Sequence, residues 1–235
     1  MSEKGMMFTT ELVQAILNGR KTQTRRVISK FHETSDTYVG NYHQIGDFLN
    51  CFCWHKNGSI PQEYIIEKFS KYQVDDIIYV KEKCGYLPIL NSDPLITDFD
   101  NQKLYYAADD NPELSGINIK WGNPMFMKRK FARLFLRVTD VRVERLQDIS
   151  AADVRAEGIK AFTYNFLNFP CIPSTLTEKH ICNSSGMFDD NSRRYREWYA
   201  DLWNKINGKK NKGAFKWDMN PFVFVYSFER VRDYT

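Results

Sequence analysis

The chain has 235 residues, of which 43% are hydrophobic and 15% aromatic, enough for one sizeable core but marginal for two domains. Its formal net charge of +4 is too small for a polycation, so affinity for nucleic acid would have to come from a local basic cluster. The five cysteines follow no disulfide-type spacing, and no signal-peptide pattern or apolar run of transmembrane length occurs. We therefore expect a cytoplasmic protein with free thiols and no membrane partner.

The first predicted element is a short helix that begins after Thr9 or Thr10, either of which can cap it. Gly19 stands where the left-handed residue that ends a helix is favoured. From Thr22 to Ile28 the chain is rich in β-branched residues and contains no Gly or Pro, which predicts a strand. The apolar face of the helix is formed by Leu12, Val13, Ile16 and Leu17.

The turn and strand after this helix carry a high density of positive charge, and no carboxylate occurs between Glu11 and Glu33. A solvated basic edge strand is one interpretation. The other is that the cations need an anionic partner, most simply phosphate, because the strand is held between apolar anchors. The five cations of this basic segment are Arg20, Lys21, Arg25, Arg26 and Lys30.

Residues 31–71 are irregular and aromatic, which predicts ordered loops with one strand. Alternate Cys and His residues in this region could bind a metal together with others further along the chain. A Cys-x-Cys pair without a second paired cluster is poor evidence for zinc, so we favour buried residues on a strand and expect no metal site. The residues considered are Cys51, Cys53, His55, Cys171, His180 and Cys182.

The pair Asp75-Asp76 predicts a turn into a buried strand, residues 77–80, which ends in Lys81 and Glu82. A surface ion pair is one interpretation of these last two residues. Residues 87–132 contain many loop-forming residues and one short strand at 103–107. The end of this region alternates aromatic and basic residues, which suits stacking on unpaired bases, although such rings also serve as core. The residues are Trp121, Phe126 and Phe131 with Lys128, Arg129, Lys130 and Arg133.

Apolar residues change parity near Thr139-Asp140, which predicts a long strand interrupted by a bulge, as barrels use to turn corners. Ser150 and Asp153 have capping-box spacing for a helix that Gly158 closes. Glu157 would then be the last helical residue, where the helix dipole disfavours a carboxylate. A functional role would explain that placement.

Two further elements complete the predicted core. Residues 189–207 carry apolar residues at helical spacing, and residues 221–228 are apolar on both faces, which predicts a central strand. Three segments are predicted to lie outside the core: a ragged leader at 1–7, an irregular insertion at 160–190 and a mobile basic loop at 208–213.

Several of these segments resemble the ASCH domain family, a branch of the PUA-like β-barrels associated with RNA and nucleotide binding. Gly19, Lys21 and Arg26 match its G-x-K-x-x-x-x-R signature, and NGRKTQTRR after an apolar helix is similar to bacterial and prophage members. Other similar blocks are VDDIIYVKEKC, VTDVRVERLQDISAADVRAEGI, LWNKINGK and NPFVFVYSFERV. The resemblance implies an α+β fold, a PUA-like mixed β-barrel with flanking helices, in one domain over residues 1–235. Insertions are expected at about 31–72, 87–126 and 160–190.

Some small members of this family are amidohydrolases that remove the acetyl group from acetylated cytidine. They use a Lys, a Thr three residues later and a Glu in the helix after the long strand, which correspond here to Lys21, Thr24 and Glu157. A lysine can activate a threonine hydroxyl if part of its population is neutral, and the neighbouring arginines favour the neutral form. Because residues three apart on a flat strand point to opposite faces, Lys21 must lie in the turn before the strand.

The resemblance also implies an RNA, nucleotide or modified-nucleoside ligand in a basic cleft. The candidate ligand-binding residues are Arg20, Arg25, Arg26, Lys81, Glu82, Lys128, Arg129 and Lys130. We expect a monomer that hydrolyses an acyl-amide substrate without cofactor or metal. A non-catalytic RNA-binding module and a metal-independent ribonuclease are the alternatives. The hydrolytic members are much shorter, and the inserted segments of this chain could reshape or close the cleft.

Overall fold

The centre of the molecule is a five-stranded mixed sheet with the strand order β1-β6-β10-β13-β2. The computed structural model describes residues 3–28, 32–34, 37–39, 53–55, 62–86, 104–109, 111, 116–159, 162–164, 169–171 and 190–232. Strands β1 and β6 pair in parallel, and the other neighbours pair antiparallel. The five strands are β1 (Glu3–Met7), β2 (Gln23–Val27), β6 (Ile77–Lys81), β10 (Phe135–Arg145) and β13 (Phe222–Val231).

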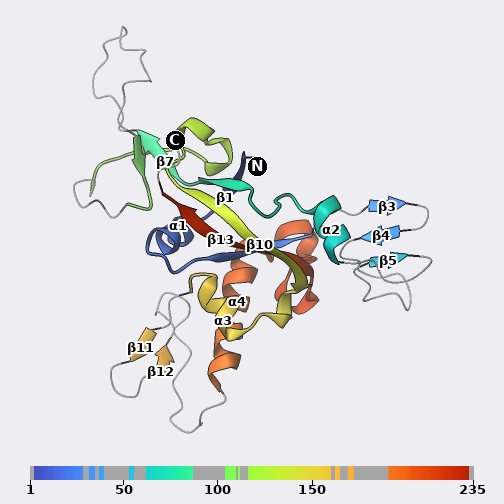
Figure 1. Cartoon of the computed structure of the whole chain (residues 1–235). Coiled ribbons are helices and arrows are strands. Elements are labelled where there is room, and N and C mark those ends of the chain that lie inside the picture. Colours follow the sequence, from blue (N-terminus) through green and yellow to red (C-terminus); the bar gives the residue numbers. More distant parts are fainter. Residues whose placement is uncertain are drawn as a thin grey trace.

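Helices and three small sheets surround this central sheet (Figure 1). The helices are α1 (Thr10–Leu17), α2 (Gln62–Phe69), α3 (Ala151–Ala156) and α4 (Asp190–Asn207). Short 3-10 turns are η4 (Pro124–Phe126), η5 (Arg129–Phe131), η6 (Leu146–Asp148), η7 (Lys210–Gly213) and η8 (Trp217–Met219). The small sheets are β3 (His32–Thr34), β4 (Thr37–Val39) and β5 (Cys53–His55); β7 (Cys84–Tyr86), β8 (Leu104–Tyr106) and β9 (Lys120–Trp121); and β11 (Phe162–Tyr164) with β12 (Phe169–Cys171).

Strand β13 separates two apolar cores, because its alternate side chains point to opposite faces of the sheet. Phe224, Tyr226 and Phe228 pack with residues of α1, α2 and β6 on one face. Val223 and Val225 pack with α3 and α4 on the other face. The prediction that this strand is central and buried on both sides is confirmed.

Several local predictions are also confirmed. The register of β10 against β13 shifts between Val138 and Asp140, where a bulge was expected. Ser150 and Asp153 form a capping box at the start of α3. Gly19 has a φ of 70°. This is the left-handed region, which glycine adopts more easily than other residues and in which helices often end. The bulge, the helix start and the helix end thus lie where the sequence placed them.

Two other segments differ from the predictions. The expected leader at 1–7 is wrong for residues 3–7, because they form β1, and Gly5 gives the Tyr79 ring room to lie against the strand. Helix α2, where loops were expected, is fixed by burial of Ile65 rather than by a strong local pattern. The basic loop predicted at 208–213 contains the 3-10 turn η7.

The expected α+β fold with a mixed sheet is confirmed, whereas the described strands do not close into a barrel. Among these strands, β1 and β2 form the two edges, and the Arg26 Nη2 atom donates a hydrogen bond to the Met7 carbonyl oxygen between them at 2.9 Å. Much of the three predicted insertions lies outside the described residues. In the described part of the chain, every helix is too short or too polar to cross a bilayer.

Candidate active site

The turn before β2 is joined to the end of α3 by backbone contacts. Lys21 and Glu157 form an isolated antiparallel bridge, and the Thr22 amide donates to the Ala156 carbonyl at 2.8 Å. Gly158 follows with a φ of 91°, and a Cβ atom there would lie 2.9 Å from the Lys21 Cβ atom. A larger residue would therefore push the two segments apart. The prediction that Lys21 lies in the turn before the strand is confirmed.

The Lys21 ammonium group is buried and fully hydrogen-bonded. It donates to the Glu157 carboxylate oxygen Oε2 at 2.6 Å, to the Glu157 carbonyl at 3.0 Å and to the Gln23 carbonyl at 2.7 Å. These three acceptors use all three donor positions of an ammonium group. The Lys21 side chain is 0% exposed and that of Glu157 is 5% exposed. The structure thus brings together two of the three predicted catalytic residues, which lie 136 positions apart.

Arg25 lies beside this pair and contacts the other carboxylate oxygen of Glu157. The Nη1 atom donates to Glu157 Oε1 at 3.2 Å, and Nη2 donates to the Glu144 carboxylate. The Asp153 carboxylate lies 3.5 Å from Nη2. Two buried cations, Lys21 and Arg25, therefore face three carboxylates in one network.

This network bears on the expectation that the cations of the basic segment are unneutralised and need an anionic partner such as phosphate. For Lys21 and Arg25 the expectation is wrong, because carboxylates 119 to 136 residues further along the chain neutralise them. The gap between Glu11 and Glu33 in the sequence says nothing about β10 and α3, which the fold brings to β2. Glu157 therefore also has the structural role of an ion-pair partner for an arginine.

The surroundings of Lys21 make its neutral form more accessible. Burial lowers the pKa of Lys21, and the charges of Arg25 and Arg26 act in the same direction, while Glu157 opposes them. The Tyr199 hydroxyl donates to Glu157 Oε1 at 3.4 Å, and burial beside this carboxylate raises the pKa of Tyr199 well above its ordinary value. The site therefore favours a neutral tyrosine and a lysine that loses its proton more easily than one in water.

The cations also compensate for the placement of Glu157 at a helix C-terminus. Glu157, predicted to be the last helical residue, is the C-cap residue of α3, one position beyond Ala156, where the helix ends. Lys21 donates to the Glu157 carbonyl, and Arg20 donates to the Gly158 carbonyl at 2.7 Å. These positive groups stabilise the negative end of the helix, where an isolated carboxylate would be unfavourable.

Thr24 lies next to this network but projects from the opposite face of β2. Its partner in the ladder is Tyr226, whose side chain belongs to the α1 side of the sheet, whereas Arg25 pairs with Val225 on the α3 and α4 side. Thr24 is 2% exposed. The Gln23 carbonyl that holds the Lys21 ammonium directly precedes Thr24 in the chain. The backbone of the third predicted catalytic residue is therefore adjacent to the Lys21 ammonium group.

The ring of Phe8 covers the Thr24 side of the cluster. The Lys21 Nζ atom lies 5.9 Å from the centre of this ring, and the Arg26 Cζ atom lies 5.2 Å from it. Both distances fit cation–π contacts. Phe8 was not among the predicted site residues, because its single apolar side chain looks like an ordinary core residue in the sequence.

Two predicted binding residues, Arg20 and Arg26, form no ion pair with a carboxylate of the described residues. Both are half-buried, and their hydrogen bonds within the described residues go to carbonyl groups rather than to carboxylates. Lys81 similarly donates to the Met125 carbonyl at 2.7 Å. Glu82 is fully buried and accepts two hydrogen bonds from Arg133 at 2.9 and 3.0 Å, so it does not face a ligand.

The other predicted binding residues lie at η5: Lys128 is its N-cap residue, and Arg129 and Lys130 belong to it. Lys128 is exposed, Arg129 forms two hydrogen bonds with the Glu3 carboxylate, and Lys130 lies 5.0 Å from the centre of the Phe131 ring. Among the described residues no group of three or more metal-ligand side chains occurs. Of the metal candidates, Cys53 and His55 belong to β5 and Cys171 to β12, while Cys51, His180 and Cys182 lie outside the described residues.

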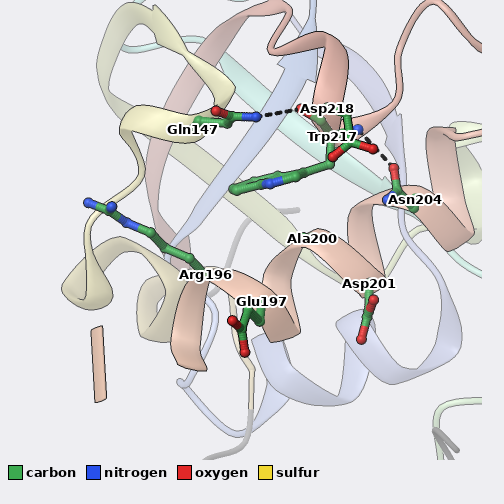
Figure 2. Close-up of a pocket in the computed structure, with 8 residues that line it drawn as sticks. All are labelled: Gln147, Arg196, Glu197, Ala200, Asp201, Asn204, Trp217 and Asp218. Carbon is green, nitrogen blue, oxygen red and sulfur yellow. Dashed lines mark hydrogen bonds between the residues drawn. The ribbon is translucent and has the colours of Figure 1, made fainter. Parts of the chain in front are cut away.

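A surface hollow of about 470 Å³ lies along α4 and does not contain the predicted catalytic residues (Figure 2). Trp217 lies on one side of it, held by a hydrogen bond from its amide to Asn204 and by one from Gln147 to its carbonyl. The Trp217 ring also contacts the ring of Tyr199, with 6.1 Å between centres. This hollow is therefore separate from the Lys21–Glu157 pair, but Tyr199 contacts both Trp217 of the hollow and Glu157 of the pair.

Sequence reasoning also missed Tyr199 as a site residue, because its helical spacing in α4 indicated core packing. Its hydroxyl group was the available signal, since a buried tyrosine needs a hydrogen-bond partner. Comparison with known proteins gives no match to a family model, a curated protein or a solved structure. The assignment of function therefore depends on the geometry of this cluster and on the motif resemblance.

Proposed function

We propose that this chain is a PUA-like ASCH domain protein that binds a nucleoside, nucleotide or RNA ligand beside the basic segment and hydrolyses an acyl amide on it. The acetyl amide of acetylated cytidine is the substrate class with the best support. The observation that carries the proposal is the 2.6 Å contact between the Lys21 ammonium and the Glu157 carboxylate. Burying such a pair is costly, and buried charges of this kind are concentrated at functional sites.

The residues support a two-step hydrolysis. In the proposed first step, substrate entry brings the Thr24 hydroxyl from the other face of β2 within reach of neutral Lys21, which takes its proton. The threonine oxygen then attacks the acyl carbon and forms a tetrahedral intermediate. Collapse of this intermediate breaks the carbon–nitrogen bond, and Lys21 returns the proton to the leaving amine of cytidine. Water then attacks the threonine ester, and Lys21 takes a proton from the water and passes it to the Thr24 oxygen as the acyl–oxygen bond breaks, which restores the hydroxyl and releases acetic acid, ionised to acetate at neutral pH. Glu157 holds the Lys21 amine beside the Gln23 carbonyl, one residue from Thr24.

The substrate has to reach Lys21 from the side of Phe8. The opposite side is closed by Glu157, Arg25 and Tyr199, which contact one another in the buried network. The Phe8 ring contacts the two cations and packs edge-to-face with Phe228, so its displacement costs packing contacts but breaks no hydrogen bond of its side chain. Arg26 lies at the same ring and would meet the anionic or polar part of the ligand.

The test is incubation of the purified protein with acetylated cytidine, with cytidine and acetate measured separately. The wild type should release the two products in equal amounts, and Lys21→Met should abolish release because the base is lost. Lys68→Ala is a matched control, since it removes an exposed lysine of α2 remote from the cluster. Absence of turnover by the wild type, or undiminished turnover by Lys21→Met, would overturn the proposal.

A non-catalytic RNA-binding module is the second candidate. It is favoured by the complete burial of Lys21 together with the free charge of Arg20 and Arg26. This candidate predicts RNA affinity that falls with salt, by about 0.7 in the logarithmic slope for each neutralised phosphate, and that survives Thr24→Val. Cleavage of the RNA in metal-free buffer would instead support the third alternative, a metal-independent ribonuclease.

A further inference from the structure

The turn η4 presents an aromatic ring to solvent. Phe126 is 77% exposed, and the neighbouring Met125 is also exposed. The turn is fixed in place, because the Asn123 side chain accepts a hydrogen bond from the Met125 amide at 2.9 Å and Lys81 donates to the Met125 carbonyl. Because the Phe126 ring is mostly in water, it contributes little buried apolar area to the fold, and it is available to a partner.

The two other aromatic residues of this region do not share that exposure. Phe131 packs edge-to-face with Tyr86, with ring centres 6.5 Å apart. Trp121 is half-buried below the Lys83 ammonium, which lies 5.5 Å from the ring centre. Of the three aromatics that the sequence singled out here, Phe126 is thus the one with an open face.

The surface around Phe126 is positive. Three carboxylates described in this region pair with arginines: Glu3 with Arg129, and Glu82 and Asp109 with Arg133. Four lysines surround these pairs without a carboxylate partner in the described part of the chain. They are Lys81, Lys83, Lys120 and Lys128.

We propose that Phe126 and these four lysines form a platform for single-stranded RNA, with a base stacked on the ring and phosphates on the lysines. Unpaired bases expose the flat faces that stack on aromatic side chains, whereas the bases of a duplex do not. The inference rests on the proposed function and narrows it: an acylated cytidine within a strand is bound more tightly than the free nucleoside.

The platform is linked to the Lys21 cluster by adjacent contacts. Lys81, whose side chain holds η4, accepts a hydrogen bond from the Phe8 amide at its carbonyl oxygen at 3.1 Å. Phe8 covers Lys21, and Arg26 bonds to the carbonyl of Met7, a residue with an exposed side chain. A strand anchored on Phe126 would therefore pass Lys81 and Met7 on its way to Arg26 and the entrance at Phe8.

Fluorescence anisotropy with a labelled, unstructured RNA of about 12 nucleotides tests the platform directly. Phe126→Ala should weaken binding about tenfold, the loss expected for one stacked base. Lys128→Ala should reduce the logarithmic salt slope by about 0.7, the loss of one phosphate contact on a single strand. Both replaced side chains are exposed, so the variants should keep the circular dichroism spectrum of the wild type.

Helix α2 provides matched controls at the other end of the molecule from β7 (Figure 1). Tyr64 is 44% exposed, and the Lys68 ammonium lies 6.0 Å from the centre of its ring, so this pair has the chemistry of the platform at another place. Tyr64→Ala and Lys68→Ala should leave RNA affinity unchanged. A duplex of the same sequence should bind more weakly than the single strand, and single-stranded DNA in parallel measures the preference for ribose.

Equal affinity of Phe126→Ala and wild type, an equal loss in Tyr64→Ala, or tighter binding of the duplex would overturn the inference. Its failure is distinguishable from failure of the proposed function. Hydrolysis of free acetylated cytidine by the wild type without Phe126-dependent binding would remove the platform alone. Binding that depends on Phe126, without any hydrolysis, would support the platform and remove the enzyme.

Discussion

Replacement of Glu157 by glutamine tests how much the Glu157 carboxylate stabilises the buried charge of Lys21. The substitution keeps the shape of the side chain but removes the carboxylate nearest to Lys21. Lys21 would then retain only uncharged acceptors: the backbone carbonyl oxygens of Gln23 and residue 157, at 2.7 and 3.0 Å, and the new amide oxygen. Removing one partner of a buried ion pair costs about 3–5 kcal/mol of the free energy of unfolding.

The reciprocal replacement, Lys21→Met, should cost less. Glu157 would keep Arg25 at 3.2 Å and the Tyr199 hydroxyl at 3.4 Å, so its charge stays compensated. The loss should fall below that of Glu157→Gln, and the double variant Lys21→Met/Glu157→Gln should be more stable than the sum of the single losses predicts. A coupling of about 0.5–3 kcal/mol is typical of residues in one such network.

Urea unfolding at pH 7, followed by tryptophan fluorescence, measures these differences as shifts in the midpoint. Glu3→Gln is the control, because the Glu3–Arg129 pair has two good hydrogen bonds but lies at the surface. Its removal should cost less than about 1 kcal/mol. A loss below 1 kcal/mol for Glu157→Gln, or a larger loss for Lys21→Met, would refute the reasoning.

Three further predictions concern the same cluster. Gly158→Ala should cost more than about 2 kcal/mol in urea unfolding and Gly19→Ala about 1, because both have positive φ but only at Gly158 would the new Cβ lie within 3 Å of its neighbours; equal losses would contradict this. Burial opposes ionisation of Asp153, yet hydrogen bonds from Ser150 outweigh it and lower its pKa to about 2. Its stabilising contribution is therefore present above its ordinary pKa of 3.8 and is lost as the pH falls towards 2, so the stability difference between wild type and Asp153→Asn should shrink over that range rather than stay constant. In acetylated-cytidine hydrolysis, kcat/KM should rise with pH through a pKa below the 10.5 of an ordinary lysine, and a limb at or above 10.5 would exclude Lys21 as the base.

Local rules predicted the elements that hold the site. The Ser150 capping box, the left-handed Gly19 and the β-branched stretch before Ile28 each depend on neighbours in the chain, so the sequence alone was sufficient. The bulge near Asp140 could be predicted for the same reason, since a change of parity is visible in one strand.

Charge neutralisation and the pairing of β1 could not be predicted in this way. The partners of Arg25 come from β10 and α3, and no local pattern shows which distant carboxylate will reach a given cation. The meeting of Lys21 with Glu157 was expected from the motif resemblance, and not from any physical property of either segment. Strand β1 has only five residues and gains its order from pairing with β6, a contact between segments more than 70 residues apart.

The proposed role of Phe126 shows the opposite difficulty. The sequence places it among alternating aromatic and basic residues, where Trp121 and Phe131 look equivalent. Only the fold separates the exposed ring of Phe126 from the packed ring of Phe131, because exposure depends on which surfaces the turns η4 and η5 cover. Composition can therefore indicate a nucleic-acid surface without identifying the residue that would stack.

The most direct measurement of the central claim is the rate of acetate release from acetylated cytidine by the wild type and by Thr24→Val, which removes the hydroxyl and keeps the branched shape. The account predicts steady release by the wild type and none by the variant, although the variant still folds. Release at the same rate by both proteins, or by neither, would contradict the assignment of Lys21, Thr24 and Glu157 to one hydrolytic site.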